Sequence, residues 1–396
     1  MAHDLPLITT IAAGLSMALI LAILAHRLRL PLIAGYLAAG IALGPFTPGF
    51  VADQHIAAEL AELGVILLMF GTGLHFHPRD LLAVRAIAIP GALVQIAVAT
   101  AAGAGLAHLL GWSLGAGLIF GLSLSVASTV VLMRALTDRK MLKTPRGQIA
   151  VGWLVVEDLV TVVALVLIPP LAGLLGSATS SVPMAELGWV LLWTLGKVVA
   201  FVALMLVVGR RVIPEILHYT ALTGERELFR LSVLAVALGV AYGASTFFGV
   251  SFALGAFFAG MVMSGSTLSA QATKDVLPFR DAFAVLFFVS VGMLFDPAVL
   301  WTNPLPVLAT IGVIVVVKSV AAFGITRALG YDRPTAATIA AALSQIGEFS
   351  FILIVMGTNL GILPEEARDY VVAGALVSII LNPFLFDLLD RGLARA

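Results

Sequence analysis

The stretch Ile149-Ala-Val-Gly-Trp-Leu-Val-Val-Glu-Asp-Leu-Val-Thr-Val-Val-Ala-Leu-Val-Leu-Ile168 places two adjacent acids, Glu157 and Asp158, inside an apolar segment that is long enough to span a membrane. An ionisable side chain at the depth of the bilayer costs about 2.5–3.5 kcal/mol on insertion scales. Two such side chains together need a cation, a proton or a buried base that compensates their charge. Glu157 and Asp158 are therefore predicted to handle cations or protons across a membrane.

The composition indicates a protein that is surrounded by lipid. Hydrophobic residues make up 61% of the 396 residues and charged residues only 11%, whereas a soluble domain has about 25% charged residues. The formal net charge is zero, which gives no indication of a nucleic-acid partner. The chain has no cysteine, which excludes disulfides, thiolate metal sites and catalytic thiols. We therefore predict a polytopic all-α membrane protein.

Apolar runs of about 20 residues recur along the whole chain, and each is long enough for one membrane crossing. We predict about 13 membrane helices, with one fewer as the alternative. The predicted ranges are 5–25, 31–44, 57–75, 83–109, 114–136, 148–171, 185–209, 228–247, 250–266, 282–298, 304–329, 334–357 and 367–389.

The positions of lysine and arginine agree with this count. All of them except Lys197, Lys318 and Arg368 fall at connections or ends on one side of the membrane. Positive charge stays on the cytoplasmic side, so we expect the N-terminus outside and the C-terminus in the cytoplasm. With an incorrect number of helices, the lysine and arginine residues would fall on both sides of the membrane.

The chain resembles itself at a separation of about 220 residues, which is the kind of period that indicates an internal repeat. Pro31–Gly44 (PLIAGYLAAGIALG) aligns with Ser251–Ser264 (SFALGAFFAGMVMS), and Gly73–Pro78 (GLHFHP) aligns with Gly292–Pro297 (GMLFDP) at nearly the same offset. Chance similarity between apolar, glycine-rich segments is the alternative. An odd number of predicted helices separates the copies, so they enter the membrane from opposite sides.

Such inverted-topology repeats are common in secondary transporters, where the site lies between the repeats at the middle of the membrane. The offset divides the chain into a first repeat (1–180), a linker helix (181–226) and a second repeat (227–396). We expect the site where the two repeats meet.

Two spans that the repeat makes equivalent carry polar patches at their centres, Ser123–Thr129 and Ser344–Ser350. Hydroxyl groups and glycine are tolerated where a backbone leaves helical geometry. We expect both helices to unwind and cross at mid-membrane, so that exposed carbonyls and half-helix ends surround the acids; ordinary packing of small residues is the alternative. The residues predicted to line these discontinuous helices are Ser125, Ser128, Thr129, Ser344, Gln345 and Glu348.

The charged residues divide into different expected roles. Asp158 is the main candidate for binding the cation and the proton, because a carboxylate holds one or the other but not both; a structural ion pair is the alternative. Lys318 lies too deep in its span to reach the headgroups and needs a partner, for which Glu157 is the expected residue. Glu348 either contributes to the ion path or satisfies an unwound backbone.

Six motifs together resemble the Kef branch of the monovalent cation:proton antiporters, and in particular the transmembrane domain of its YbaL-type members. The resemblance covers nearly the whole chain. The motifs are Gly64–Gly71 (GVILLMFG), Ser125–Val131 (SVASTVV), Gly152–Asp158 (GWLVVED), Phe252–Gly260 (FALGAFFAG), Phe287–Met293 (FFVSVGM) and Ser344–Phe349 (SQIGEF).

The resemblance implies the NhaA/NapA-like antiporter fold and a homodimer in a bacterial inner membrane. The first three helices and the eighth to tenth would form a dimerisation and gate domain. Helices 4–6 and 11–13 would form a mobile core that contains the two crossed discontinuous helices. The essential aspartate of the family maps to Asp158 and its core lysine to Lys318, while an elevator-like movement would expose the site to each side in turn.

The resemblance also implies a transporter rather than an enzyme, with no cofactor. Its substrates would be protons and a monovalent cation, K⁺ first and Na⁺ next; a cation channel is the alternative function. Typical Kef proteins have Gln-Asp where this chain has Glu157-Asp158, so the resemblance does not set the charge stoichiometry. They also continue into a cytoplasmic nucleotide-binding regulatory domain, whereas this chain stops at Ala396, which favours a truncated sequence.

Overall fold

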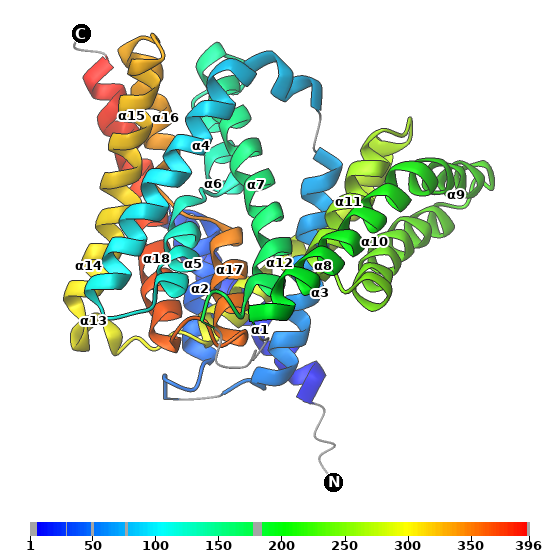
Figure 1. Ribbon diagram of the computed structural model, residues 1–396, viewed down its shortest axis with the longest axis horizontal. Coiled ribbons are helices and arrows are strands. Elements are labelled where there is room, and N and C mark those ends of the chain that lie inside the picture. The colour runs from blue at the N-terminus through cyan, green and yellow to red at the C-terminus, as the bar shows by residue number, and fades with distance from the viewer. Residues whose placement is uncertain (1–5, 29, 49–50, 76–77, 177–183, 394–396) are drawn as a thin grey trace.

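The computed structural model describes residues 6–28, 30–48, 51–75, 78–176 and 184–393, and within them every regular element is a helix (Figure 1). The predicted all-α class is therefore confirmed for this part of the chain. The first helices are α1 (Pro6–Arg27), α2 (Leu32–Leu43), α3 (Gln54–His75), α4 (Pro78–Leu109), α5 (Leu114–Ser125), α6 (Thr129–Asp138), α7 (Pro145–Leu171), α8 (Met184–Leu204), the π-helical turn η1 (Met205–Gly209) and α9 (Arg210–Leu222).

The second half of the chain contains the remaining elements. They are α10 (Arg226–Phe248), α11 (Phe252–Ser264), α12 (Ser269–Met293), α13 (Val299–Thr302), α14 (Pro304–Gly312), the π-helical turn η2 (Val313–Val317), α15 (Lys318–Ala328), α16 (Arg333–Leu343), α17 (Glu348–Asn359) and α18 (Glu365–Leu393).

Within the described residues, 8 helices are long and apolar enough to cross a membrane, or up to 9 when the bent pair α16–α17 counts as one span. Three shorter apolar helices, α2, α5 and α11, lie beside them. Every predicted range overlaps a helix, but the number of crossings stays a prediction.

Two predicted boundaries differ from the structure for the same physical reason. The helix predicted at 282–298 is α12, which begins at Ser269 and ends at Met293, and the helix predicted at 185–209 continues through η1 into α9 as far as Leu222. In both cases the extra turns are rich in charged residues, including Lys274, Asp275, Arg210 and Arg211. Hydropathy alone marks such turns as connections, although they remain helical.

The helices form two groups of neighbours. In the first, α3 packs against α11 and α12, α2 against α1 and α12, and α10 against α11. In the second, α4 packs against α5, α7 and α15, and α18 packs against α14, α16 and α17. Figure 1 shows α9 and α10 on the opposite side of the molecule from α13 to α15. The division into a gate domain and a mobile core stays a prediction.

Glycines bring the backbones of two helix pairs into contact. A Cβ atom at Gly40 of α2 would lie 2.7 Å from Cα of Gly292 in α12, and one at Gly260 of α11 would lie 3.1 Å from the carbonyl carbon of Gly73 in α3. Only glycine allows backbones to approach so closely. The sequence alignment pairs Gly40 with Gly260 and Gly73 with Gly292, so the two contacts join equivalent positions of the aligned segments.

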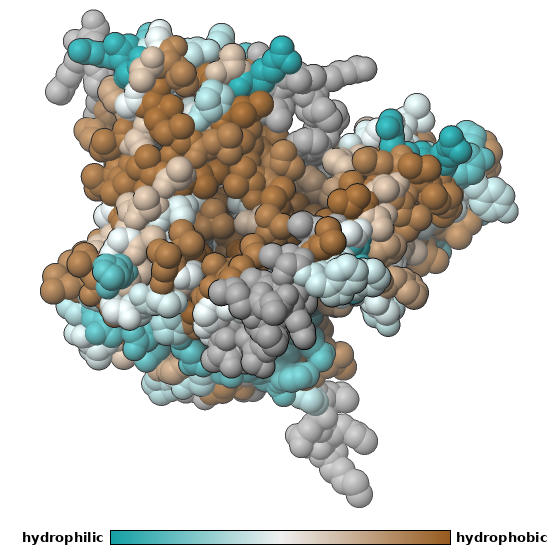
Figure 2. All heavy atoms as spheres, viewed as in Figure 1, coloured by the Kyte–Doolittle hydropathy of each residue, from teal (hydrophilic) through white to brown (hydrophobic). Residues whose placement is uncertain are grey.

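Hydrophobic and hydrophilic residues are distributed over the surface as expected for a protein in lipid. In Figure 2, hydrophobic residues form a broad band, and hydrophilic residues gather above and below it. Large apolar side chains in this surface are exposed, such as Leu19 at 62%, Leu308 at 62% and Val320 at 66%. Because exposure of so much apolar area is favourable only in lipid, the prediction of an integral membrane protein is supported.

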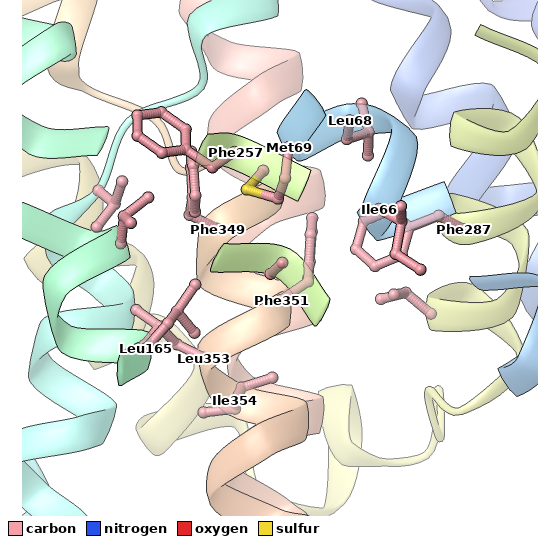
Figure 3. Packing of buried hydrophobic residues seen from close by; sticks show 14 of the residues in the cluster. Ile66, Leu68, Met69, Leu165, Phe257, Phe287, Phe349, Phe351, Leu353 and Ile354 are labelled. Atoms are coloured by element: carbon pink, nitrogen blue, oxygen red, sulfur yellow. The ribbon is translucent and has the colours of Figure 1, made fainter. Parts of the chain in front are cut away.

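The apolar core connects the two groups of helices. Figure 3 shows Phe349, Phe351 and Leu353 of α17 packed among side chains from α3, α7, α11 and α12. The Phe351 ring lies 6.1 Å from the Phe288 ring, edge to face, a favourable arrangement for two aromatic rings. This packing fixes α17 beside the acids of α7.

Candidate functional site

Both spans with central polar patches are interrupted at those patches. The first stops at Ser125 and resumes as α6 at Thr129, and the second stops at Leu343 and resumes as α17 at Glu348. The second pair is bent by 43° at its break. Ser128 caps α6, since its side chain accepts a hydrogen bond from Val131 N.

The two breaks are in direct contact with each other. Ser128 N donates to Gln345 Oε1 at 2.9 Å, and Gln345 Nε2 donates back to Ser128 O at 3.1 Å. A Cβ atom at Gly347 would lie 2.6 Å from Ser128 Cα. The Gln345 side chain thus satisfies the free backbone N–H and C=O groups of Ser128, which lipid cannot do.

Glu157 binds the backbone of the first break. Its Oε2 accepts a hydrogen bond from Ala127 N at 2.9 Å, and the side chain is fully buried. Gln95 of α4 supports the same break, because its Nε2 donates to Ser125 O at 3.2 Å. Glu157 therefore stabilises the unwound segment through a charge-assisted hydrogen bond.

Lys318 binds the backbone of the second break. It follows the π-helical turn η2, and π-bulges often occur at functional positions. Its buried Nζ donates to Gln345 O at 2.9 Å. Among the described residues, no direct salt bridge joins it to Glu157.

Glu157 and Lys318 interact through their charges without forming a direct salt bridge. Each side chain binds a backbone group that its nearby break leaves free, and the two opposite charges attract each other across the breaks. The sequence could not show this, because the positions of the free backbone groups depend on how the breaks meet.

Asp158 lies beside Thr129 of the first break. Its Oδ2 accepts a hydrogen bond from Thr129 Oγ1 at 3.1 Å. Its Oδ1 has no hydrogen-bond partner among the described residues, although the side chain is only 6% exposed, and Oε1 of the buried Glu157 has none either. A buried carboxylate oxygen without a partner is costly, so each of the two acids has an oxygen that a proton or an ion would stabilise.

Asp158 faces a large cavity. The cavity has a volume of about 970 Å³, and Thr129, Asp158 and Glu348 contribute to its lining. It extends to the ends of α1 and α6, where His26 and Asp138 line it. The Asp158 side chain thus borders a cavity that continues to the ends of two helices.

The remaining predicted residues have different surroundings. The hydroxyl groups of Ser125 and Ser344 donate within their own helices, to Leu122 O and Ala341 O, each at 2.7 Å. Neither residue contributes to the lining of the large cavity. Both residues lie at the breaks, where the hydroxyl of a serine often bonds to a carbonyl of the preceding turn, and their contribution to ion binding stays a prediction.

Two buried amides contribute to the site without having been predicted. Gln95 binds the first break, as described above, and Asn382 of α18 donates to Ala341 O at 2.7 Å and lines the cavity. Their signal in the sequence is a single amide side chain in an otherwise apolar span, which needs a partner in the membrane. Among the described residues, no group of three or more His, Cys, Asp or Glu side chains could hold a metal ion.

Interrupted helices that meet beside a buried acid and a large cavity define a membrane transporter for ions. The profile of the sodium/hydrogen exchanger transmembrane family matches residues 14–389. The chain belongs to this family, whose members are transporters and not enzymes.

Individual relatives agree with the family. The candidate cation/proton antiporter YbaL of Escherichia coli is 59% identical over 400 residues, which cover 100% of this chain and 70% of YbaL. K(+) efflux antiporter 4 of Arabidopsis thaliana is 34% identical over 361 residues, covering 91% of this chain and 60% of that protein. The sodium proton antiporter MjNhaP1 of Methanocaldococcus jannaschii has a similar fold, with a TM-score of 0.64, 16% identity, and coverage of 98% of this chain and 96% of that chain.

Proposed function

We propose that this protein exchanges a monovalent cation for protons across a membrane and that both ions bind at Asp158. The observation that carries this proposal is that Asp158 lines the large cavity, whereas Glu157 does not contribute to its lining. A cation and a proton compete for that carboxylate, so release of one permits binding of the other. This competition is sufficient to couple the two fluxes.

The adjacent acids Glu157 and Asp158 have different roles. Glu157 is engaged with Ala127 N, and together with Lys318 it stabilises the two breaks. Asp158 lines the cavity and is the residue that exchanges ions. These different roles would explain why the chain has two acids at a depth where each costs insertion free energy.

The exchange proceeds by alternating access. The cavity extends to the ends of α1 and α6, which the distribution of lysine and arginine places on the cytoplasmic side. We therefore propose that this conformation opens inward. The equivalent glycine contacts of α2 with α12 and of α11 with α3 support the inverted repeat, which provides a matching outward-open state when the core moves against the gate domain.

K⁺ is the proposed cation, with Na⁺ next. The names of two relatives refer to cation/proton exchange and to K⁺ efflux, which supports this order. The number and spacing of oxygen atoms around the ion set such selectivity. We also propose a homodimer in a bacterial inner membrane, with the N-terminus outside.

Transport in sealed proteoliposomes tests the proposed exchange. An outward gradient of K⁺ or Na⁺ should drive proton uptake, and an imposed proton gradient should drive cation movement in the opposite direction. A cation channel would instead pass cations without regard to the proton gradient. Proton movement that is independent of the cation would contradict exchange.

The attraction between Glu157 and Lys318 makes a separate prediction about stability. Lys318→Gln should lower the melting temperature in detergent by several degrees, because Glu157 loses its opposite charge and Gln345 O loses a charged donor. When Glu157 is already Gln, the same substitution should cost clearly less. Lys197→Gln on α8 serves as the control for a lysine outside the site. Additive losses in melting temperature would show that the two charges do not interact.

A further inference from the structure

A second carboxylate lines the same cavity as Asp158. Glu348 is the first residue of α17 and is only 6% exposed. The two acids come from different helices, α7 and α17. The cavity is therefore bordered by two buried carboxylates that are far apart in the sequence.

The two carboxylates are electrostatically linked. The negative charges of Glu348 and Glu157 both repel that of Asp158. Because the side chains of Asp158 and Glu348 are mostly buried, water weakens this repulsion less than it would at the surface. Two carboxylates in this arrangement stay together only if a proton or a cation is placed between them.

Several contacts of Glu348 partly offset the cost of burying its negative charge. Its position in the first turn of α17 places it at the positive end of the helix dipole. Ser128 Oγ donates a hydrogen bond to Glu348 Oε2 at a long 3.4 Å. The positive charge of Arg280 in α12 attracts the Glu348 carboxylate. Glu157 is the other acid whose negative charge repels that of Asp158, and the positive charge of Lys318 balances the charge of Glu157.

We propose that Glu348 is a second ligand for the transported cation, which is held between the carboxylates of Asp158 and Glu348. The hydroxyl of Thr129 would complete a set of oxygen ligands, the type of donor that monovalent cations require. When the cation leaves, the two acids share a proton in its place. This assignment rests on the proposed function and adds a residue to its binding site.

The proposal predicts a specific change in transport kinetics. Glu348→Gln should raise the apparent KM for K⁺ by at least about tenfold, because a charged ligand is lost. The maximal rate should change much less, since Asp158 still takes up and releases the proton. Glu348→Asp should raise the KM by an intermediate factor, because the carboxylate is kept but withdrawn by one methylene group.

The experiment measures initial rates of K⁺-driven proton movement in proteoliposomes with choline chloride as the balancing salt. It also measures the concentration of KCl that half-maximally raises the melting temperature of the purified protein. Glu227→Gln is the matched control, because Glu227 is an exposed acid in the first turn of α10. Its KM and half-maximal concentration should match those of the wild type.

An unchanged KM in both Glu348 variants would overturn the proposal while leaving exchange at Asp158 intact. A lower melting temperature with an unchanged KM would do the same, since it would show a purely structural role for Glu348. If Glu348→Gln does not fold, the KM of Glu348→Asp decides, and a value equal to that of the wild type contradicts the assignment. Absence of K⁺-driven proton movement in the wild type would instead refute the proposed function.

Discussion

Replacing Asp158 with asparagine should reduce cation-coupled proton movement to the rate of protein-free vesicles. Asparagine has nearly the same shape and still accepts a hydrogen bond from Thr129 Oγ1, which lies 3.1 Å from Asp158 Oδ2. Its amide does not take up a proton in this range of pH and does not bring a negative charge to the cation. Coupling through competition at this position is therefore lost.

The fold should survive the Asp158→Asn substitution. Removal of an unpaired buried charge relieves a desolvation cost, so the melting temperature in detergent should stay the same or rise. The control is Asp332→Asn, an exposed aspartate at the start of α16 whose side chain makes no capping hydrogen bond; it should exchange like the wild type. Normal exchange by Asp158→Asn would show that the ion binds elsewhere.

Gly347→Ala should separate the two breaks and abolish most of the exchange. Its backbone is extended, with φ −123° and ψ −168°, so alanine fits the local conformation. The added Cβ, however, would lie 2.6 Å from Ser128 Cα, and backbone atoms on both sides cannot move aside cheaply. Overpacking of this kind costs about 1–3 kcal/mol.

The Gly347→Ala substitution should also weaken the paired hydrogen bonds between Ser128 and Gln345, which hold the first break beside Asp158. The melting temperature and the initial rate of exchange measure the two effects. Gly324→Ala is the matched control, because a Cβ at Gly324 in α15 meets nothing within 4 Å, and alanine favours a helix by about 1 kcal/mol. Equal behaviour of the two variants would mean that contact between the breaks is unimportant.

The sequence was sufficient to locate the breaks and the acids, because polar groups in a membrane span are rare and each has a physical reason. The repeat offset of about 220 residues also indicated which segments meet. Hydrogen bonds between the two breaks join residues separated by 217, 220 and 224 positions. A pattern of apolar residues and polar patches thus predicted contacts that are distant in the chain.

The partners of individual side chains could not be predicted in the same way. Glu157 was expected as the partner of Lys318, but the hydrogen bonds of the two side chains go to backbone groups, Gln345 O for Lys318 and Ala127 N for Glu157. Which backbone groups are free depends on where each helix stops, and a sequence leaves this uncertain by a residue or two. The roles of Gln95 and Asn382 depend on the same detail.

Competition at Asp158 is tested most directly by the apparent KM for K⁺ measured at several pH values in proteoliposomes. A proton that occupies the same carboxylate raises the apparent KM, so the KM should fall by about tenfold for each unit of rising pH on the acidic side, with the maximal rate unchanged. At higher pH the KM should become constant, because the competing proton is gone. An apparent KM that is independent of pH, with only the maximal rate changing, would contradict binding of both ions at Asp158.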